Sequence, residues 1–164
     1  MAPPIVADDR ANILIIITRP ENMEFFNKIV EAIDIGVEPF LVATALREAR
    51  EEVGLHPDHV EVIGTLPEYL TGTGYRVTPV VSLVTPPFEL TLQHSEVAQA
   101  VEVPLGFLMN PRHHQRRVVR SESGERGFYA MPFRPSDESR EYFIWGATAA
   151  MLRNLYWFLA ARQV

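Results

Sequence analysis

The sequence predicts an α+β or α/β sandwich that forms one soluble globular domain over residues 1–164. Three observations support this prediction. Short apolar segments rich in β-branched residues are interspersed with a mid-chain and a terminal helical pattern. The chain is 47% hydrophobic and 22% charged, as in ordinary globular proteins. A chain of this length buries roughly 70% of its unfolded surface, so the core needs no disulfide, in agreement with the absence of cysteine.

The first third of the chain contains the clearest helix signal. Residues 12–18 are a β-branched apolar run that predicts a buried strand, and residues 21–33 have a helical spacing of apolar side chains. Residues 39–53 predict a helix, because Pro39 is tolerated in a first turn and Gly54 can end the helix in the left-handed conformation. The apolar stripe of this helix comprises Val42, Ala45, Leu46, Ala49 and Val53.

The remaining elements follow from alternation and turn signals. Residues 60–66 and 76–85 predict strands, and Pro86–Pro87 ends the second of them. Residues 96–103 alternate polar and apolar side chains, and residues 104–109 predict a short helix. Residues 116–120 and 127–133 predict a hairpin, and residues 146–162 predict a terminal helix. The apolar face of that helix carries Ala149, Leu152, Leu155, Tyr156 and Leu159.

Charge and composition exclude several function classes. The net charge of -6 disfavours general nucleic-acid binding, so we expect no nucleic-acid partner. The longest aliphatic run, from Ile13 to Ile17, is far shorter than a membrane span, so we expect no membrane association. Without cysteine there is no thiol nucleophile and no Cys-ligated zinc. The chain also begins without a signal-peptide pattern, and the sequence predicts a cytoplasmic protein.

Three carboxylates gather on one face of the helix expected at residues 39–53. Glu48, Glu51 and Glu52 fall within about 100° of arc, where like charges repel one another. Arg47 and Arg50 compensate part of this repulsion, and a hard divalent cation with oxygen ligands compensates the rest. A solvated helix face with Glu–Arg pairs is the alternative interpretation.

The segment Arg47-Glu-Ala-Arg-Glu-Glu-Val-Gly-Leu55 resembles the second half of the Nudix box, whose pattern is Gly-x5-Glu-x7-Arg-Glu-hydrophobic-x-Glu-Glu-x-Gly-hydrophobic. The resemblance implies an α/β/α sandwich with a mixed sheet, a helix that binds Mg²⁺ or Mn²⁺, and hydrolysis of a nucleoside diphosphate linked to another moiety. It also implies residue roles. Glu51 and Glu52 are the principal metal ligands, Glu48 is a further ligand or helps to activate water, and Arg47 orients the glutamates.

Further carboxylates are candidates for completing such a metal site. Glu38 precedes the helix, whereas Glu96 and Glu102 lie in a later segment that we expect to include a loop. We favour Glu96 as the additional ligand.

Later segments resemble the bacterial coenzyme A pyrophosphatase branch of the Nudix family, namely residues 41–49, 69–81, 96–105, 110–117 and 144–152. This resemblance implies cleavage of coenzyme A or an acyl-CoA into 3',5'-ADP and 4'-phosphopantetheine. The stretch 112–120 holds four arginines and is either a solvated loop and edge strand or an anion subsite for a 3'-phosphate. Candidate substrate-binding residues are Arg76, Arg116 and Arg117. Trp145 either contacts substrate or only begins and packs the terminal helix.

The resemblance stops upstream of Glu38. The family pattern has Phe-Pro-Gly-Gly before the box, whereas residues 29–32 are Ile-Val-Glu-Ala. Eight of the ten isoleucines and the only lysine, Lys28, lie in the first 35 residues. We therefore hypothesise that residues 12–35 have diverged, been rearranged or been mis-specified, and we treat residues 1–37 as atypical.

Two alternatives to coenzyme A hydrolysis remain open. One is a Nudix hydrolase of ADP-ribose, NADH or a nucleoside triphosphate. The other is a catalytically weakened Nudix-fold protein that binds nucleotide without turnover. In each case the expected partner is a small-molecule nucleotide. The aromatic residues Tyr156, Trp157 and Phe158 of the terminal helix are a candidate homodimer interface.

Overall fold

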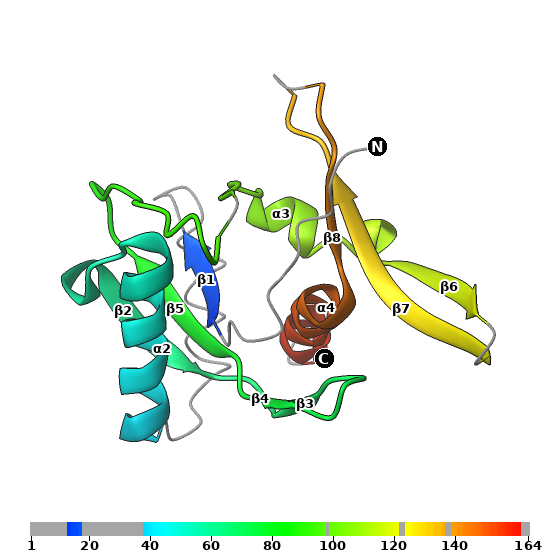
Figure 1. The fold of residues 1–164 in the computed structure, drawn as a ribbon, viewed down its shortest axis with the longest axis horizontal. Helices are drawn as coiled ribbons and strands as arrows, with labels where there is room; N and C mark the ends of the chain where they lie inside the picture. Colours follow the sequence, from blue (N-terminus) through cyan, green and yellow to red (C-terminus); the bar gives the residue numbers. More distant parts are fainter. Residues whose placement is uncertain (1–12, 18–37, 98, 122–123, 137–138, 162–164) are drawn as a thin grey trace. The chain divides into compact units, whose positions relative to one another are not determined.

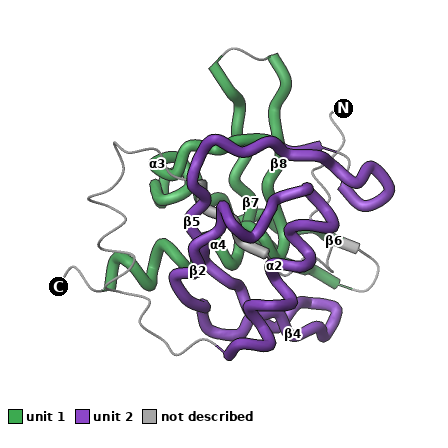
Figure 2. The backbone as a smooth tube through the Cα atoms, turned by 90° about the vertical axis from the view of Figure 1, so that its left-hand side faces the viewer, with its two compact units in different colours: residues 1–8, 101–161 green, residues 9–100, 162–164 purple. Residues whose placement is uncertain are grey.

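The computed structural model describes residues 13–17, 38–97, 99–121, 124–136 and 139–161, and these residues form an α+β fold (Figure 1). The described chain divides into two compact units (Figure 2). What we call the first unit contains the described residues between 9 and 100 and is purple in Figure 2 (unit 2 of its key). What we call the second unit contains those between 101 and 161 and is green (unit 1 of its key). We describe each unit by itself.

The first unit is built on a mixed sheet with strand order β1-β5-β2. Strand β1 (Ile13–Ile17) pairs in parallel with β5 (Val80–Val84), and β2 (Val60–Thr65) pairs with the other edge of β5 in the antiparallel direction. The register of β2 shifts between Val62 and Gly64. The short strands β3 (Tyr69–Leu70) and β4 (Arg76–Val77) form a separate hairpin. The 3₁₀ turn η2 (Pro57–His59) leads into β2.

Helix α2 (Pro39–Val53) packs against this mixed sheet. The buried core where they meet contains Ala49, Leu55 and Val84. Val53, Val60 and Phe88 pack around that core. The helix is therefore fixed in rotation by its small and apolar side chains, and its other side is left to the solvent.

Most of the predicted elements of this unit are confirmed, with one correction. The strand predicted at 12–18 is β1, the helix predicted at 39–53 is α2, and the strand predicted at 60–66 is β2. The single strand predicted at 76–85 is wrong, because the chain leaves β4 and begins β5 on either side of Thr78 and Pro79. Proline has no N–H for a ladder hydrogen bond, and here the chain exchanges one pairing partner for another.

The second unit is an antiparallel sheet covered on one side by helices. Strands β6 (Gln115–Ser121), β7 (Gly124–Phe133) and β8 (Tyr142–Trp145) lie in that order. Helix α4 (Gly146–Ala160) packs on β7 and β8, and helix α3 (Leu105–Leu108) packs on α4. The 3₁₀ turn η3 (Pro111–His113) joins α3 to the sheet. The buried side chains beneath the helices include Met131, Phe133, Tyr142, Ile144 and Leu155.

In this unit the predicted hairpin is confirmed as β6–β7, and the short helix predicted at 104–109 is confirmed as α3. Strand β8 was not predicted. The helix predicted at 146–162 ends at Ala160, because Ala161 already belongs to a 3₁₀ turn, a usual way for a last turn to end, and Arg162 lies outside the described residues.

Three further segments need comment. The alternating residues 96–97 and 99–103 form neither helix nor strand. The helix predicted at 21–33 and the atypical residues 29–32 lie outside the described residues. Over the part of the chain that the structure describes, no helix has the length and apolar character needed to cross a membrane.

Candidate functional site

The candidate site is carried by helix α2, whose two ends are set by local sequence signals. Pro39 occupies the first turn, and the carbonyl of Glu38 accepts a 3.0 Å hydrogen bond from the N–H of Leu41. At the other end Gly54 has a φ of 70° and donates its N–H to the carbonyl of Arg50 at 3.1 Å. This left-handed cap stops the helix one residue after Val53.

Burial on one side of α2 decides which side chains face away from the sheet. Ala45 and Ala49 are buried, and they allow the helix to lie close to its neighbours. Arg47 and Glu51 are exposed and Glu48 is half-buried. The acidic side chains expected to hold metal therefore lie beside the packed side of the helix, with Glu48 and Glu52 half-buried next to it and Glu51 turned further toward the solvent.

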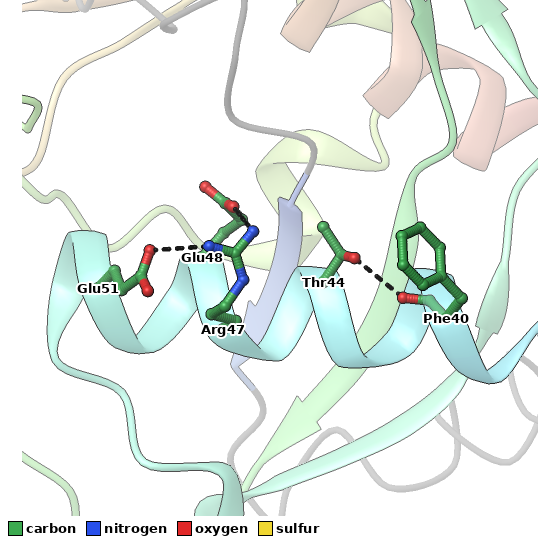
Figure 3. Close-up of polar contacts among 5 residues, drawn as sticks. All are labelled: Phe40, Thr44, Arg47, Glu48 and Glu51. Atoms are coloured by element: carbon green, nitrogen blue, oxygen red, sulfur yellow. Dashed lines mark hydrogen bonds and ion pairs between the residues drawn. The ribbon is translucent and has the colours of Figure 1, made fainter.

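Arg47 joins two of these carboxylates (Figure 3). Its Nη2 donates to Oε1 of Glu48 at 2.8 Å, and its Nη1 donates to Oε2 of Glu51 at 3.4 Å. The side chain of Glu48 is 27% exposed, compared with 57% for that of Glu51. One guanidinium thus partly neutralises two carboxylates from successive turns and holds them toward the same point.

The carboxyl end of α2 is held by a segment that lies more than thirty residues further along the chain. The N–H of Thr91 donates to the carbonyl of Val53 at 2.9 Å, and the N–H of Gln93 donates to the carbonyl of Glu52 at 2.8 Å. These bonds satisfy helix carbonyls that have no partner within the helix. We call residues 91–93 the strap. The residue Glu52, whose carbonyl accepts one of these bonds, is half-buried.

Glu96 follows the strap directly. Its N–H donates to the carbonyl of Gln93 at 2.9 Å, so the turn that carries Glu96 is attached to the residue that bonds to Glu52. Glu96 is exposed. The structure therefore ties the loop of Glu96 to the same end of α2 that carries Glu51 and Glu52.

The donor set of α2 suits a hard divalent cation. Carboxylate oxygens are the ligands that Mg²⁺ prefers, with waters and substrate phosphates completing its octahedron. Over the described residues, no group of three or more His, Asp or Glu side chains is already placed to hold a metal ion. Arg47 lies between Glu48 and Glu51, so these carboxylates would have to turn from the guanidinium in order to bind an ion.

Glu38 lies at the opposite end of the helix. Glu51 is thirteen positions further along the chain, which corresponds to roughly 20 Å along the helix axis. One ion cannot bridge that span. Glu38 therefore does not join the proposed ligand set.

The candidate substrate-binding arginines belong to different parts of the structure. Arg76 on β4 is exposed and pairs with Oε1 of Glu68 at 3.2 Å. Arg116 and Arg117 are exposed on β6, in the second unit. The guanidinium of Arg117 donates to Oε1 of Gln115 at 2.7 and 3.2 Å.

Sequence reasoning missed the strap. Thr91 and Gln93 contribute backbone N–H groups, which every residue except proline has, so the residue types at these positions do not reveal the bonds. The one local signal is Gly54, because a Cβ there would lie 3.0 Å from both the backbone nitrogen and the Cβ of Thr91.

Comparison with known proteins gives relatives over most of this chain. No protein-family model matches it. The "Uncharacterized Nudix hydrolase NudL" of Citrobacter koseri is 38% identical over 116 residues, which are 70% of this chain and 57% of the relative. The protein of the same name from Escherichia coli O7:K1 is 37% identical over 116 residues, with the same coverage. The one from Klebsiella pneumoniae is 37% identical over 123 residues, 74% of this chain and 60% of the relative. The chain thus spans less than two thirds of the length of these relatives.

Proposed function

The chain belongs to the Nudix hydrolase family, and on this basis we propose that it is an enzyme that hydrolyses a pyrophosphate bond in a nucleoside diphosphate derivative with the help of a divalent metal ion. The observation that carries the proposal is the pair of contacts from Arg47 to Glu48 and Glu51. Together with Glu52, this places three carboxylates in the last two turns of a well-capped helix.

The proposed metal ligands are Glu51 and Glu52, with Glu48 as a further ligand or as the group that receives a proton from the attacking water. A bound Mg²⁺ or Mn²⁺ would neutralise charge that develops on the phosphoryl oxygens and lower the pKa of a coordinated water. Arg47 orients Glu48 and Glu51 through its two N–H groups.

We propose Glu96 as the additional carboxylate. Its support is the chain of backbone bonds from Glu96 to Gln93 and from Gln93 to Glu52. A ligand on a loop can complete a coordination shell after the helix residues have bound the ion, because a loop turns more readily than a helix.

The proposed substrate is coenzyme A or an acyl-CoA, with 3',5'-ADP and 4'-phosphopantetheine as products. This choice is supported by the resemblance of residues 69–81, 110–117 and 144–152 to the coenzyme A pyrophosphatase branch. Arg117 is proposed to bind the 3'-phosphate. Arg116, which points to the opposite face of β6, and Arg76 are proposed to contact other parts of the substrate. We further propose that the whole chain forms one domain with the α/β/α sandwich of the family. We also propose that the protein works in the cytoplasm and that it can form a homodimer.

A substrate panel tests the proposal. The protein is incubated with Mg²⁺ or Mn²⁺ and with coenzyme A, ADP-ribose, NADH or ATP, and the products are separated by chromatography. We expect 3',5'-ADP and 4'-phosphopantetheine from coenzyme A at a higher kcat/KM than any product from the other substrates. Faster cleavage of ADP-ribose, NADH or ATP would assign the other substrate class.

Binding without product would instead indicate a weakened Nudix-fold protein. Calorimetry with coenzyme A and Mn²⁺ separates that outcome from an absence of binding.

A further inference from the structure

The sheet of the second unit has one face that no helix among the described residues of that unit covers. Arg153 of α4 lies over the ring of Tyr129 at 4.5 Å, so α4 packs on the side of β7 to which Tyr129 points. Successive strand residues point to opposite faces. Phe128 therefore points away from α4, and the cross-strand pairs place Arg117 beside Phe128 and Trp145 beside Ala130 on that same face.

Aromatic rings and guanidinium groups dominate this face, which we call the aromatic face: Arg117, Arg126, Phe128, Phe143 and Trp145. Phe128 and Trp145 form an edge-to-face pair with ring centroids 5.6 Å apart. The guanidinium of Arg117 lies over the ring of Phe143 at 5.3 Å. Trp145 remains 39% exposed, which is unusual for a tryptophan in a sheet whose other face is buried.

Arg117 is held in place on this face. Its Nε and Nη2 donate to Oε1 of Gln115, and Phe143 supports the guanidinium from beneath. The side chain has therefore lost part of its rotational freedom before any ligand arrives, which lowers the entropic cost of gripping an anion. Arg126 lies further along the same face, opposite Val119, and is exposed.

The local charge favours an anionic ligand although the whole chain is acidic. Residues 101–161 contain eight arginines against six aspartates and glutamates, whereas the chain as a whole has a net charge of -6. A second copy of the chain would be a poor occupant, because a symmetric pairing would bring Arg117 and Arg126 against the same arginines. A ligand that combines an aromatic ring with negatively charged groups can stack on the rings of this face and also form ion pairs with its guanidinium groups.

We propose that the aromatic face binds the nucleotide part of the substrate, with its base stacked on Trp145 and its phosphate groups on Arg117 and Arg126, an inference that rests on the proposed function. Two strand spacings and two residues separate the Cα atoms of Trp145 and Arg117, roughly 12 Å from standard sheet dimensions. The Arg117 side chain is long enough to meet, within this distance, the phosphate groups of a nucleotide whose base stacks on Trp145. Base stacking on aromatic residues together with arginine–phosphate contacts is a general mode of nucleotide recognition.

This binding needs no metal and no hydrolysis, and the chain offers a spectroscopic way to isolate it. Its two tryptophans are Trp145 and Trp157. Trp157 is on α4, where Arg153 lies 5.5 Å from its ring centre, and it is not part of the aromatic face. The variant Trp157→Phe reports on Trp145 alone, and Trp145→Phe is the matched control that reports on Trp157 alone.

The test titrates both single-tryptophan variants with ADP in EDTA, which removes metal from α2 and prevents turnover. We expect saturable quenching of Trp145 emission and no saturable change in Trp157 emission. Arg117→Ala and Arg126→Ala, each made in the Trp157→Phe background, should weaken ADP binding by about tenfold, as expected when a charge-assisted hydrogen bond is lost. Adenosine should bind more weakly than ADP and equally in the arginine variants and their parent, and pyrophosphate should not quench.

Several results would overturn the proposal. One is the absence of saturable quenching with ADP, and another is equal quenching of Trp145 and Trp157. Glu51→Gln and Glu52→Gln together should leave ADP binding unchanged, so a loss of quenching in that variant would assign the signal to α2. If a single-stranded oligonucleotide bound more than tenfold tighter than ADP, the ligand of this face would be a nucleic acid and not a nucleotide. Trp145 emission that changes on dilution without ligand would show that a second copy covers the face.

Discussion

The backbone N–H of Gln93 donates a 2.8 Å hydrogen bond to the carbonyl oxygen of Glu52. This bond connects the acidic end of α2 to the strap, which follows β5 in the chain. Thr91 makes the equivalent bond to the carbonyl of Val53. The end of the helix is thus closed twice, by the left-handed Gly54 and by the strap, and both devices fix the backbone from which Glu51 and Glu52 extend.

Gly54→Ala should destabilise the protein by about 2 kcal/mol, because a side chain is strained at a positive φ and its Cβ would meet Thr91 at 3.0 Å. The free energy of unfolding in urea measures the effect. Gly72→Ala is the matched control, since a Cβ at Gly72 meets nothing within 4 Å, and it should change the free energy by less than about 0.5 kcal/mol. Equal stability of the two variants would contradict the role given to Gly54.

Glu96→Gln should lower kcat by on the order of tenfold to a hundredfold at saturating Mn²⁺, because the variant loses a charged oxygen ligand while it keeps the shape of the side chain. Glu89→Gln, on the exposed chain just before the strap, serves as the control and should retain its kcat. Steady-state hydrolysis of coenzyme A measures both. A wild-type kcat in Glu96→Gln would remove Glu96 from the metal site.

Arg47→Ala should lower kcat by about tenfold, because Glu48 and Glu51 lose the donor that holds them together. Arg47→Lys keeps the charge but lacks the planar fork that reaches both carboxylates, so its kcat should lie between those of wild type and Arg47→Ala. Arg134→Ala removes an exposed arginine paired with Glu141 at 3.7 Å and should leave kcat unchanged. A wild-type kcat in Arg47→Lys would show that the positive charge suffices and that the geometry of the guanidinium does not matter.

Arg117→Ala should raise KM for coenzyme A by about tenfold, as expected for the loss of one arginine–phosphate contact. The comparison substrate is dephospho-coenzyme A, which lacks the 3'-phosphate, and its KM should stay within about twofold of the wild-type value. An equal rise in KM for both substrates would show that Arg117 does not recognise the 3'-phosphate.

The parts of the fold that were predicted correctly are those with local causes. Pro39 and Gly54 set the bounds of α2 through backbone preferences that act within one turn. The hairpin β6–β7 was predicted from the turn-forming sequence Ser-Glu-Ser-Gly between two strand-like segments. In each case the physical signal lies in the segment itself.

The parts that were missed depend on distant partners. The break between β4 and β5 at Pro79 arises because the two halves pair with different strands, although each half has an ordinary strand sequence. Strand β8 is four residues long and runs directly into α4, which is too short a stretch for alternation to be recognised. For the site, the pattern at residues 47–55 placed the carboxylates on one helix, whereas the attachment of the Glu96 loop depends on backbone bonds that the sequence does not encode by residue type.

The central claim is that the carboxylates of α2 hold a metal ion that is required for pyrophosphate hydrolysis. The most direct measurement is the rate of coenzyme A hydrolysis in saturating Mn²⁺ by the wild type, by Glu51→Gln combined with Glu52→Gln, and by the exposed control Glu61→Gln on β2. We predict that the double variant loses more than about a hundredfold in rate while remaining folded, and that the control keeps the wild-type rate. A double variant that hydrolyses coenzyme A as fast as the wild type would contradict the claim.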